Sequence, residues 1–396
     1  MSQPDAIWFM EGVSSQKDIL ALVAQARRAG RHDFVLIASH RSSRPEILAE
    51  ADVAYLEPED DGALFAFIRH VCQQHRVRAI HAGKRGALLE QQRTAIEALD
   101  VRLVTGARER ATFTLADNKT RFSAEMSAHG LPAVPSIEVR TPDEVAAAIA
   151  QVEAQGHRPC IKPVHGIYGM GFWVLRRDAH TLSFFNNPDS RQIHPDVLIE
   201  SLRRAQQAGE SLPLQIVMPW LAGPERSVDM LVENGRVIAA VARRKEGSVQ
   251  VFEQETPAWR LAVACAETLH VDGLINVQTR NDAEGHPVLL EANLRPSGGI
   301  GYTAFSGINL PGLFALRQLE LISAADAIAQ RAAFNPVQVI PTNAVQPLHS
   351  VTLSHGLPAR MRSAADDRCL TDLSARAAWR HAACRNDERD ATGDAV

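Results

Sequence analysis

The chain has 396 residues, of which 45% are hydrophobic and 22% are charged. Its 42 Lys and Arg residues nearly balance 46 Asp and Glu residues, and the formal net charge of −4 leaves no global basic field to hold nucleic acid or an anionic membrane. No apolar run approaches the roughly 18 residues of a membrane span, no secretory signal is evident, and the five cysteines include no Cys-x-x-Cys pair. We therefore expect a soluble, cytoplasmic, multidomain protein with no nucleic-acid or membrane partner.

The first hundred residues alternate short apolar runs with helical patterns. This alternation predicts a parallel sheet with helices on both faces. The turn after the first apolar run reads Gly12-Val13-Ser14-Ser15 and is not Gly-x-Gly-x-x-Gly, so a nicotinamide-type dinucleotide ranks low. The predicted strands span residues 6–10, 34–39, 54–56 and 79–82, and the predicted helices span 16–29 and 64–74.

Two β-hairpins are predicted further along the chain, one on each side of a bend. The first pairs residues 160–162 with 172–175 across a glycine-rich turn, and the second pairs 274–280 with 287–291. Between them, Asn234-Gly235 is a strong signal for another hairpin turn. Helices are expected over 109–129, 142–154 and 256–269, and from about residue 350 the periodicity is lost.

The glycine-rich turn of the first hairpin reads Gly166-Ile167-Tyr168-Gly169-Met170-Gly171 and follows Lys162. Glycines allow backbone amides to approach phosphate oxygens, and a lysine beside the turn adds a positive charge. The turn has two interpretations: a flap over the triphosphate of ATP, or an ordinary hairpin turn whose glycines only supply positive φ. It is not a Walker loop, because Gly-Lys-Ser/Thr is missing and a strand follows in place of a helix.

Oxygen-bearing side chains are concentrated on the second hairpin. Glu291 and Asn293 are two residues apart and share one face of a strand, and Gln278 lies on the strand before them. Such a set suits a hard cation such as Mg²⁺, with phosphate oxygens and water completing the shell. Arg295, two residues on, would face the same site and hold a phosphoryl group. The alternative interpretation is the polar outer face of an amphipathic hairpin.

The segment from Met218 to Glu225 reads Met-Pro-Trp-Leu-Ala-Gly-Pro-Glu and predicts a bend between two lobes. Backbone groups at such a bend can read the edge of an adenine, and Trp220 or its neighbours can pack against the base. The Glu225 carboxylate can accept hydrogen bonds from ribose hydroxyls. Taken alone, a plain surface turn is the favoured interpretation.

The order of these features along the chain resembles that of the ATP-grasp superfamily, most closely the arrangement in carbamoyl phosphate synthetase and biotin carboxylase. The resemblance covers about residues 1–345 and rests on the spacing of seven from Met218 to Glu225 and on the run Gln278…Glu291-x-Asn293-x-Arg295. It implies a multidomain α/β and α+β protein, with an ATP-grasp fold preceded by a parallel-sheet α/β domain. The implied parts are an N-terminal α/β domain over 1–105, a helical connection over 106–125, a small lid over 126–217, a large lobe with the metal site over 218–345, and a poorly specified tail over 346–396.

The resemblance also implies roles for individual residues. Lys162 and Arg295 would be catalytic. Contacts to ATP would come from Lys119, Lys162, Gly169, Gly171, Met218, Pro219, Trp220, Leu221 and Glu225. The ligands of Mg²⁺ or Mn²⁺ would be Gln278, Glu291 and Asn293. Met218 stands where an acid is frequent, and His165 and Tyr168 are atypical of the flap, which favours a distinct branch of the superfamily.

The activity that the resemblance implies is that of an ADP-forming carboxylate–amine ligase. A carboxylate would attack the γ-phosphate of ATP to give an acyl phosphate, and an amine would displace the phosphate. The implied partners are small-molecule carboxylates and amines, together with a second copy of the chain, since the family often dimerises. Two other classes stay open: a carboxylase or carbamoyl-type enzyme that uses bicarbonate, and a non-catalytic ATP-binding regulator.

The residues that choose the substrate are harder to assign. Arg243, with Arg244 and Lys245, would clamp a carboxylate, although a solvated charge run is the favoured interpretation. The glycine-rich run Ser297-Gly298-Gly299 is a second candidate, because it lies beside the predicted metal ligands. His81 and Lys84, at the end of a predicted strand, lie where open α/β sheets bind ligands, and they are equally compatible with ordinary loop residues.

Overall fold

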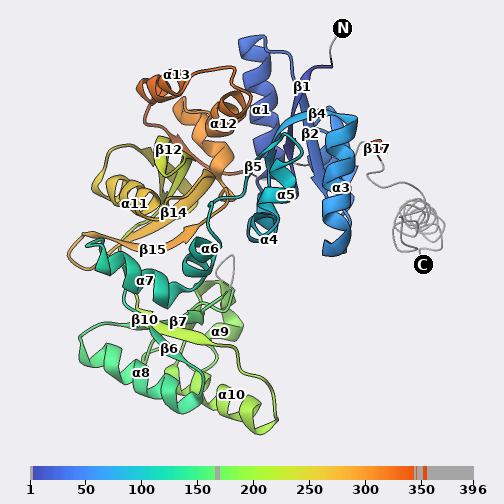
Figure 1. Ribbon diagram of the computed structural model, residues 1–396. Helices are drawn as coiled ribbons and strands as arrows, with labels where there is room; N and C mark the ends of the chain where they lie inside the picture. The colour runs from blue at the N-terminus through green and yellow to red at the C-terminus, as the bar shows by residue number, and fades with distance from the viewer. Residues whose placement is uncertain (1–2, 166–169, 343–344, 346–350, 355–396) are drawn as a thin grey trace, which may run out of the picture.

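The computed structural model describes residues 3–165, 170–342, 345 and 351–354. Within these residues the strands form an N-terminal sheet, a small sheet and a large sheet. The N-terminal and large sheets lie next to each other, and the small sheet lies beyond one end of the large sheet (Figure 1). No helix in the described ranges combines the length and the apolar character that a membrane crossing requires.

The N-terminal sheet is parallel, as predicted, with the strand order β17-β3-β2-β1-β4-β5. Its strands are β1 (Asp5–Phe9), β2 (Val35–His40), β3 (Val53–Leu56), β4 (Arg76–His81), β5 (Arg102–Val104) and β17 (Leu353–Ser354). Its helices are α1 (Gln16–Gly30), α2 (Pro45–Leu48), α3 (Asp61–Gln74), the 3₁₀ helix η1 (Gly83–Arg85), α4 (Gly86–Glu90) and α5 (Arg93–Glu97). The lost periodicity after residue 350 did not predict β17, which pairs Leu353 with Ala54 at the sheet edge.

The helix predicted over residues 109–129 is two helices, α6 (Arg110–Asp117) and α7 (Lys119–Ala128). Asn118 interrupts them with extended backbone angles, φ −96° and ψ 102°, and its side chain accepts a hydrogen bond from the amide of Arg121. An asparagine that caps a helix in this way competes with helix continuation, so the prediction of one helix was wrong. The break places Lys119 at the start of α7.

The small sheet has the order β6-β10-β7-β8-β9 and carries its helices on one face (Figure 1). Its strands are β6 (Ile137–Val139), β7 (Pro159–Pro163), β8 (Trp173–Leu175), β9 (Gln192–Ile193) and β10 (Gln215–Pro219), and its helices are α8 (Pro142–Ala154), α9 (Ser183–Asn186), η2 (Pro188–Ser190) and α10 (Pro195–Gln207). A capping box of Thr141 and Glu144 starts α8. The predicted hairpin is confirmed, because Cys160 pairs with Val174 across β7 and β8.

The large sheet is antiparallel, with the order β15-β14-β11-β12-β13-β16. Its strands are β11 (Glu225–Glu233), β12 (Arg236–Glu246), β13 (Val249–Glu253), β14 (Gly273–Asn281), β15 (Pro287–Asn293) and β16 (Gln338–Val339). Its helices are α11 (Pro257–Thr268), η3 (Ile300–Ser306), α12 (Leu310–Gln318), α13 (Ala324–Ala329) and η4 (Gln330–Ala333). The predicted turn at Asn234-Gly235 joins β11 to β12, and both residues have positive φ.

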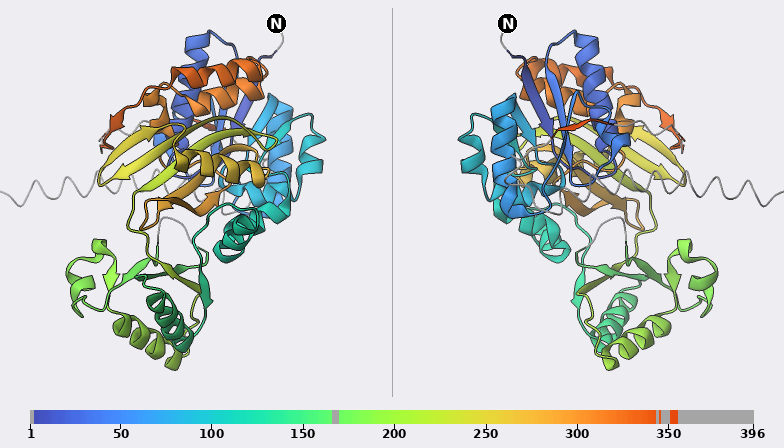
Figure 2. Two further views of the ribbon diagram at one scale, coloured as in Figure 1. Left: turned by 90° about the vertical axis from the view of Figure 1, so that its left-hand side faces the viewer. Right: turned by 90° about the vertical axis from the view of Figure 1, so that its right-hand side faces the viewer.

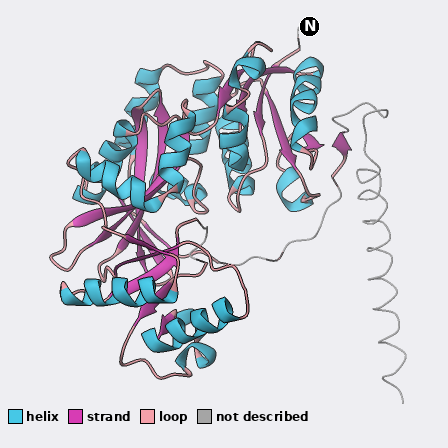
Figure 3. Ribbon diagram, turned by 60° about the horizontal axis from the view of Figure 1, so that its bottom comes forward, coloured by secondary structure: helices cyan, strands magenta, loops and turns pink. Residues whose placement is uncertain are grey.

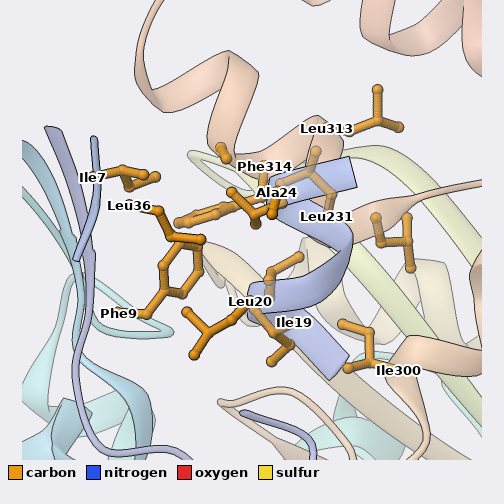
Figure 4. Packing of buried hydrophobic residues seen from close by; sticks show 14 of the residues in the cluster. Ile7, Phe9, Ile19, Leu20, Ala24, Leu36, Leu231, Ile300, Leu313 and Phe314 are labelled. Carbon is orange, nitrogen blue, oxygen red and sulfur yellow. The ribbon is translucent and has the colours of Figure 1, made fainter. Parts of the chain in front are cut away.

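One hydrophobic core joins the N-terminal sheet to the large sheet. Helix α1 packs between them, and its Leu20 lies among side chains from β1, such as Phe9, and from α12, such as Phe314 (Figure 4). Helices flank both sheets (Figure 3). Because these two parts share buried surface, they form one unit, whereas the small sheet and its helices have a core of their own.

The small sheet is attached to the rest of the molecule through few contacts (Figure 2). Its connection to the large sheet includes two backbone hydrogen bonds at Leu289, whose amide donates to Pro132 at 2.8 Å and whose carbonyl accepts from Val134 at 3.1 Å. A separate core on a narrow attachment is the arrangement in which one part can rotate as a body against another.

His81 makes the stability of this shared core depend on pH. The ring is buried against Phe314, with 5.3 Å between ring centroids, and burial lowers its pKa from the usual 6.5 to about 4. His81 is therefore protonated below about pH 6.5 in the unfolded chain but only below about pH 4 in the folded chain. We expect the free energy of unfolding to fall by about 3 kcal/mol over this range, in addition to other acid effects. Urea unfolding at several pH values measures it, and His81→Gln should lose this component; an unchanged pH slope in that variant would contradict the assignment.

Candidate functional site

A cleft of about 580 Å³ lies between the small sheet and the large sheet. Side chains from both predicted hairpins line it, so the two segments face each other as expected. The predicted site residues that line the cleft are Lys119, Lys162, Met218, Trp220, Leu221, Glu225, Arg243, Gln278, Glu291, Asn293, Arg295, Ser297, Gly298 and Gly299.

Three predicted residues are not among those that line the cleft. They are Pro219, Gly169 and Gly171. Pro219 ends β10 and is buried. Gly169 lies outside the described residues, and so does its neighbour Tyr168. Gly171 has φ +72°, and a Cβ there would come within 2.8 Å of the Pro163 ring. The conformation and packing of the turn therefore account for this glycine.

Strand alternation explains how the large sheet builds one wall of the cleft. Every second residue of β11, β12 and β14 faces the same side, and at one end of these strands that side is apolar and packs against α1 and α12 through Leu231 and Leu274. Towards the other end, the same face becomes polar. The polar residues on it are Glu225, Ser227 and Asp229 of β11, Arg243 and Lys245 of β12, Asn276, Gln278 and Arg280 of β14, and Glu291 and Asn293 of β15.

The predicted metal ligands occupy neighbouring positions on this polar face. Gln278 pairs directly with Glu291, and Asn276 pairs with Asn293, so these four side chains lie side by side on two strands. The Asn293 amide donates to the Glu291 carboxylate at 3.2 Å. In the described ranges no group of three or more His, Cys, Asp or Glu side chains is placed to hold a metal. The set formed by Gln278, Glu291 and Asn293 differs from such a group, because two of its three side chains are amides.

Basic side chains complete the same part of the cleft. The Lys119 ammonium donates to the carbonyl of Val164 at 2.7 Å, which directs it to the base of the glycine turn. Burial lowers the pKa of Lys162, and Lys119 adds to this effect while Glu291, across the cleft, opposes it. Within the described part of the chain, the side chains of Lys162 and Arg295 form neither a hydrogen bond nor an ion pair and are available to a ligand.

The other end of the cleft is apolar. Met218 and the partly buried Trp220, Leu221, Phe172 and Leu290 belong to one hydrophobic cluster and all line the cleft. The backbone amide of Trp220 donates to the carbonyl of Arg158 at 2.7 Å, so it is not free to read a base. Met218, which departs from the expected acid, therefore contributes apolar surface.

The three consecutive basic residues Arg243, Arg244 and Lys245 of β12 point in different directions and do not act together as a clamp or as one solvated run. Arg244 faces away from the cleft and pairs with Glu253, because successive residues of a strand point to opposite faces. Lys245 pairs with Glu225 inside the cleft. Only 3% of Arg243 is exposed, although its sequence context favoured a solvated side chain.

Arg243 is the centre of a buried hydrogen-bond network under the cleft. Its guanidinium donates to Asp229 at 2.8 Å, to Ser227 at 3.0 Å and to Ser297 at 2.7 Å, and it also bonds to Gln250. A buried arginine is stabilised only when such partners surround it. The network ties the loop after β15 to the floor of the cleft.

The candidates in the N-terminal sheet have structural partners. His81 is buried in the shared core, and Lys84 donates to the buried Glu11 carboxylate at 2.6 Å. Both lie at the carboxyl edge of the sheet, and their interpretation as ordinary structural residues is the one that these contacts favour.

Comparison with known proteins finds a family model that matches part of the chain. The model of a family described as "ATP-grasp in the biosynthetic pathway with Ter operon" matches residues 211–343, which contain the bend, the polar face and the predicted metal hairpin. Residues 211–343 are therefore similar to an ATP-grasp family. No curated protein matches the chain at a significant level.

Solved structures have the same fold. L-amino acid ligase from Bacillus licheniformis is 18% identical with a TM-score of 0.52, over 81% of this chain and 75% of that chain. N5-carboxyaminoimidazole synthase from Aspergillus clavatus, in complex with ADP and 5-aminoimidazole ribonucleotide, is 14% identical with a TM-score of 0.52, over 82% and 79%. The biotin carboxylase domain of Hydrogenobacter thermophilus 2-oxoglutarate carboxylase, in complex with MgADP, ADP and bicarbonate, is 15% identical with a TM-score of 0.53, over 81% and 70%.

Several residues that line the cleft were not predicted from the sequence. Ser227, Asn276 and Arg280 each lie two residues from a predicted site residue on the same strand. That spacing places them on the same face, so the signal was present. Cys160 and Tyr302 also line the cleft, and only the packing of the two sheets and η3 reveals them.

The Arg243 network leaves no room for a side chain at Gly299. A Cβ at Gly299 would lie 2.5 Å from Nη1 and 2.7 Å from Cζ of the Arg243 guanidinium, which four hydrogen-bond partners hold in place. We expect Gly299→Ala to lower the free energy of unfolding by about 1–3 kcal/mol. Gly298→Ala is the matched control, because its Cβ would meet only Ser14 Oγ at 3.2 Å. Equal losses of stability in urea unfolding of the two variants would contradict this interpretation.

Proposed function

We propose that this protein is an ATP- and Mg²⁺-dependent ligase of the ATP-grasp type that joins a carboxylate to an amine and releases ADP and phosphate. The observation that carries the proposal is one cleft in which Lys119 of α7 and Lys162 of the small sheet face oxygen-bearing side chains of the large sheet. Solved structures of the same fold in complex with ADP or MgADP support a nucleotide as the ligand. L-amino acid ligase, another structure of this fold, supports a carboxylate and an amine as substrates.

The apolar end of the cleft fits the adenine ring. Met218, Trp220 and Leu221 offer apolar surface, and the bend between β10 and β11 offers backbone groups at Leu221. Glu225 lies next along the chain, where its carboxylate would accept hydrogen bonds from ribose hydroxyls. The pairing of Glu225 with Lys245 holds that carboxylate at the rim of the polar face.

The polar end fits the phosphates and the cation. Lys119, Lys162 and Arg295 supply positive charge to phosphate oxygens from two sides of the cleft. Gln278, Glu291 and Asn293 would hold Mg²⁺ or Mn²⁺. Because this set contains a single carboxylate, it suits a cation that arrives with phosphate oxygens as its other ligands.

The residues of the chain then account for the chemistry. ATP would supply the γ-phosphoryl group, and the bound cation would offset charge on its phosphate oxygens. Lys162 and Arg295 would stabilise the charge that moves as the substrate carboxylate attacks, which yields an acyl phosphate and ADP. The amine then displaces phosphate. The small sheet, with its own core, would close over the site and exclude water from the acyl phosphate.

The reaction is tested with purified protein, ATP, Mg²⁺ and a panel of carboxylates and amino acids. We expect ADP release that requires both an organic carboxylate and an amine, because the acyl phosphate is consumed only when an acceptor is present. Release that depends on bicarbonate alone would favour a carboxylase-type enzyme. Tight ATP binding with no release from any pair would favour a non-catalytic regulator, and either result would contradict the proposal.

Replacement of the proposed metal ligands on the β14–β15 hairpin tests the metal site. We expect Glu291→Ala combined with Asn293→Ala to weaken the binding of MgADP by about tenfold or more, since the cation loses protein ligands on one side. Isothermal titration measures the affinity. Glu284→Ala, an exposed residue in the turn of the same hairpin, is the control and should bind as the wild type does. Full MgADP affinity in the double variant would show that the metal assignment is wrong.

A further inference from the structure

Asn276 lies beside the proposed metal ligands but was not among them. It is on β14, directly paired with Asn293 on β15 and with Asp229 on β11. Its side chain lines the cleft, yet only 1% of the residue is exposed. A polar side chain that is buried to this extent needs partners for both of its amide groups.

The contacts of Asn276 determine which way its amide points. The nitrogen Nδ2 donates to Ser227 Oγ at 2.8 Å, to the carbonyl of Val228 at 3.2 Å and to Asp229 Oδ1 at 3.2 Å. A carbonyl and a carboxylate only accept hydrogen bonds, so the opposite orientation would place the Asn276 oxygen against two acceptors. The nitrogen therefore faces β11, and the oxygen Oδ1 is on the other side of the amide, away from β11; on that side Asn276 pairs with Asn293 of β15, and the residue lines the cleft.

The Oδ1 atom of Asn276 has no hydrogen-bond partner among the described residues. Leaving a buried acceptor unsatisfied costs about 1–3 kcal/mol, so such an atom in a cleft is expected to meet a donor when a ligand binds. We propose that Asn276 is a positioning residue of the metal site, whose Oδ1 accepts a hydrogen bond from a water molecule bound to the cation. This inference rests on the proposed function.

The position of the oxygen favours a hydrated cation over other donors. Asn293, the residue opposite, is a proposed ligand, so a cation held there brings its remaining waters next to Asn276. Mg²⁺ keeps several waters in most protein sites, and a donor set with one carboxylate leaves positions for them. Asn276 is itself fixed by three acceptors on β11, which makes it a rigid partner for such a water. Its role is that of a positioning residue.

The test measures Mn²⁺ binding without turnover. Free Mn²⁺ is counted by electron paramagnetic resonance in titrations of the full chain, alone and with ADP. We expect Asn276→Ala to raise the Kd of Mn²⁺ about tenfold, within the usual effect of losing an outer-shell partner, while the affinity for ADP without metal stays within twofold.

Two control variants separate this role from a structural one. Ser227→Ala removes one acceptor of Nδ2 and leaves Oδ1 in place, so it should keep Mn²⁺ affinity. Thr279→Val removes a buried hydroxyl that also lacks a partner in the described chain but lies on the opposite face of β14, and it should keep the affinity as well.

The possible outcomes are distinct. Mn²⁺ affinity within twofold of wild type in Asn276→Ala would overturn the inference and leave the proposed function intact. An equal loss in Ser227→Ala would also overturn it, because the effect would then come from the Nδ2 contacts. If Asn276→Ala keeps the cation but raises KM for the amine, the oxygen accepts from the amine instead. A wild-type chain that binds no Mn²⁺ even with ADP would overturn both this inference and the proposed metal site.

Discussion

The alternation of side chains along the large sheet is the constraint on which the rest of this structure depends. Strands β11, β12 and β14 each carry apolar residues at one end of a face and polar residues at the other end of the same face. The apolar end is buried against α1 and α12 and fixes the N-terminal sheet to the large sheet. The polar end is thereby left to form the floor of the cleft, held in register by backbone hydrogen bonds that extend into the buried core.

Rigidity is distributed unevenly in this arrangement. The floor of the cleft is supported by the Asp229–Arg243 pair and by the shared core beneath it, so the proposed metal ligands are presented by a stiff surface. The small sheet brings Lys162 from a part with a separate core. A ligase that forms an acyl phosphate needs both properties, since its ligands must be placed accurately and water must be excluded afterwards.

Much of the site was predictable because it is encoded by short-range patterns. The spacing of Glu291, Asn293 and Arg295 depends only on the period of a strand, and the bend at Pro219 and the turn at Asn234-Gly235 depend on local backbone preferences. The same local reasoning failed where a single residue changed the outcome, as at Asn118, which caps a new helix. It also failed for β17, whose pairing with β3 joins residues about 300 positions apart and has no local signal.

The sequence by itself determined the mixed α/β organisation, the two hairpins, the bend and the identity of most cleft residues, since periodicity and spacing are properties of neighbouring positions. Only the tertiary structure decided what each charged residue does. Arg243, Arg244 and Lys245 are consecutive in the sequence, yet one is buried in a network, one faces away and one pairs with Glu225. The unpaired oxygen of Asn276 likewise becomes visible only when the strands on both sides are in place, because burial and hydrogen-bond satisfaction depend on residues distant in the chain.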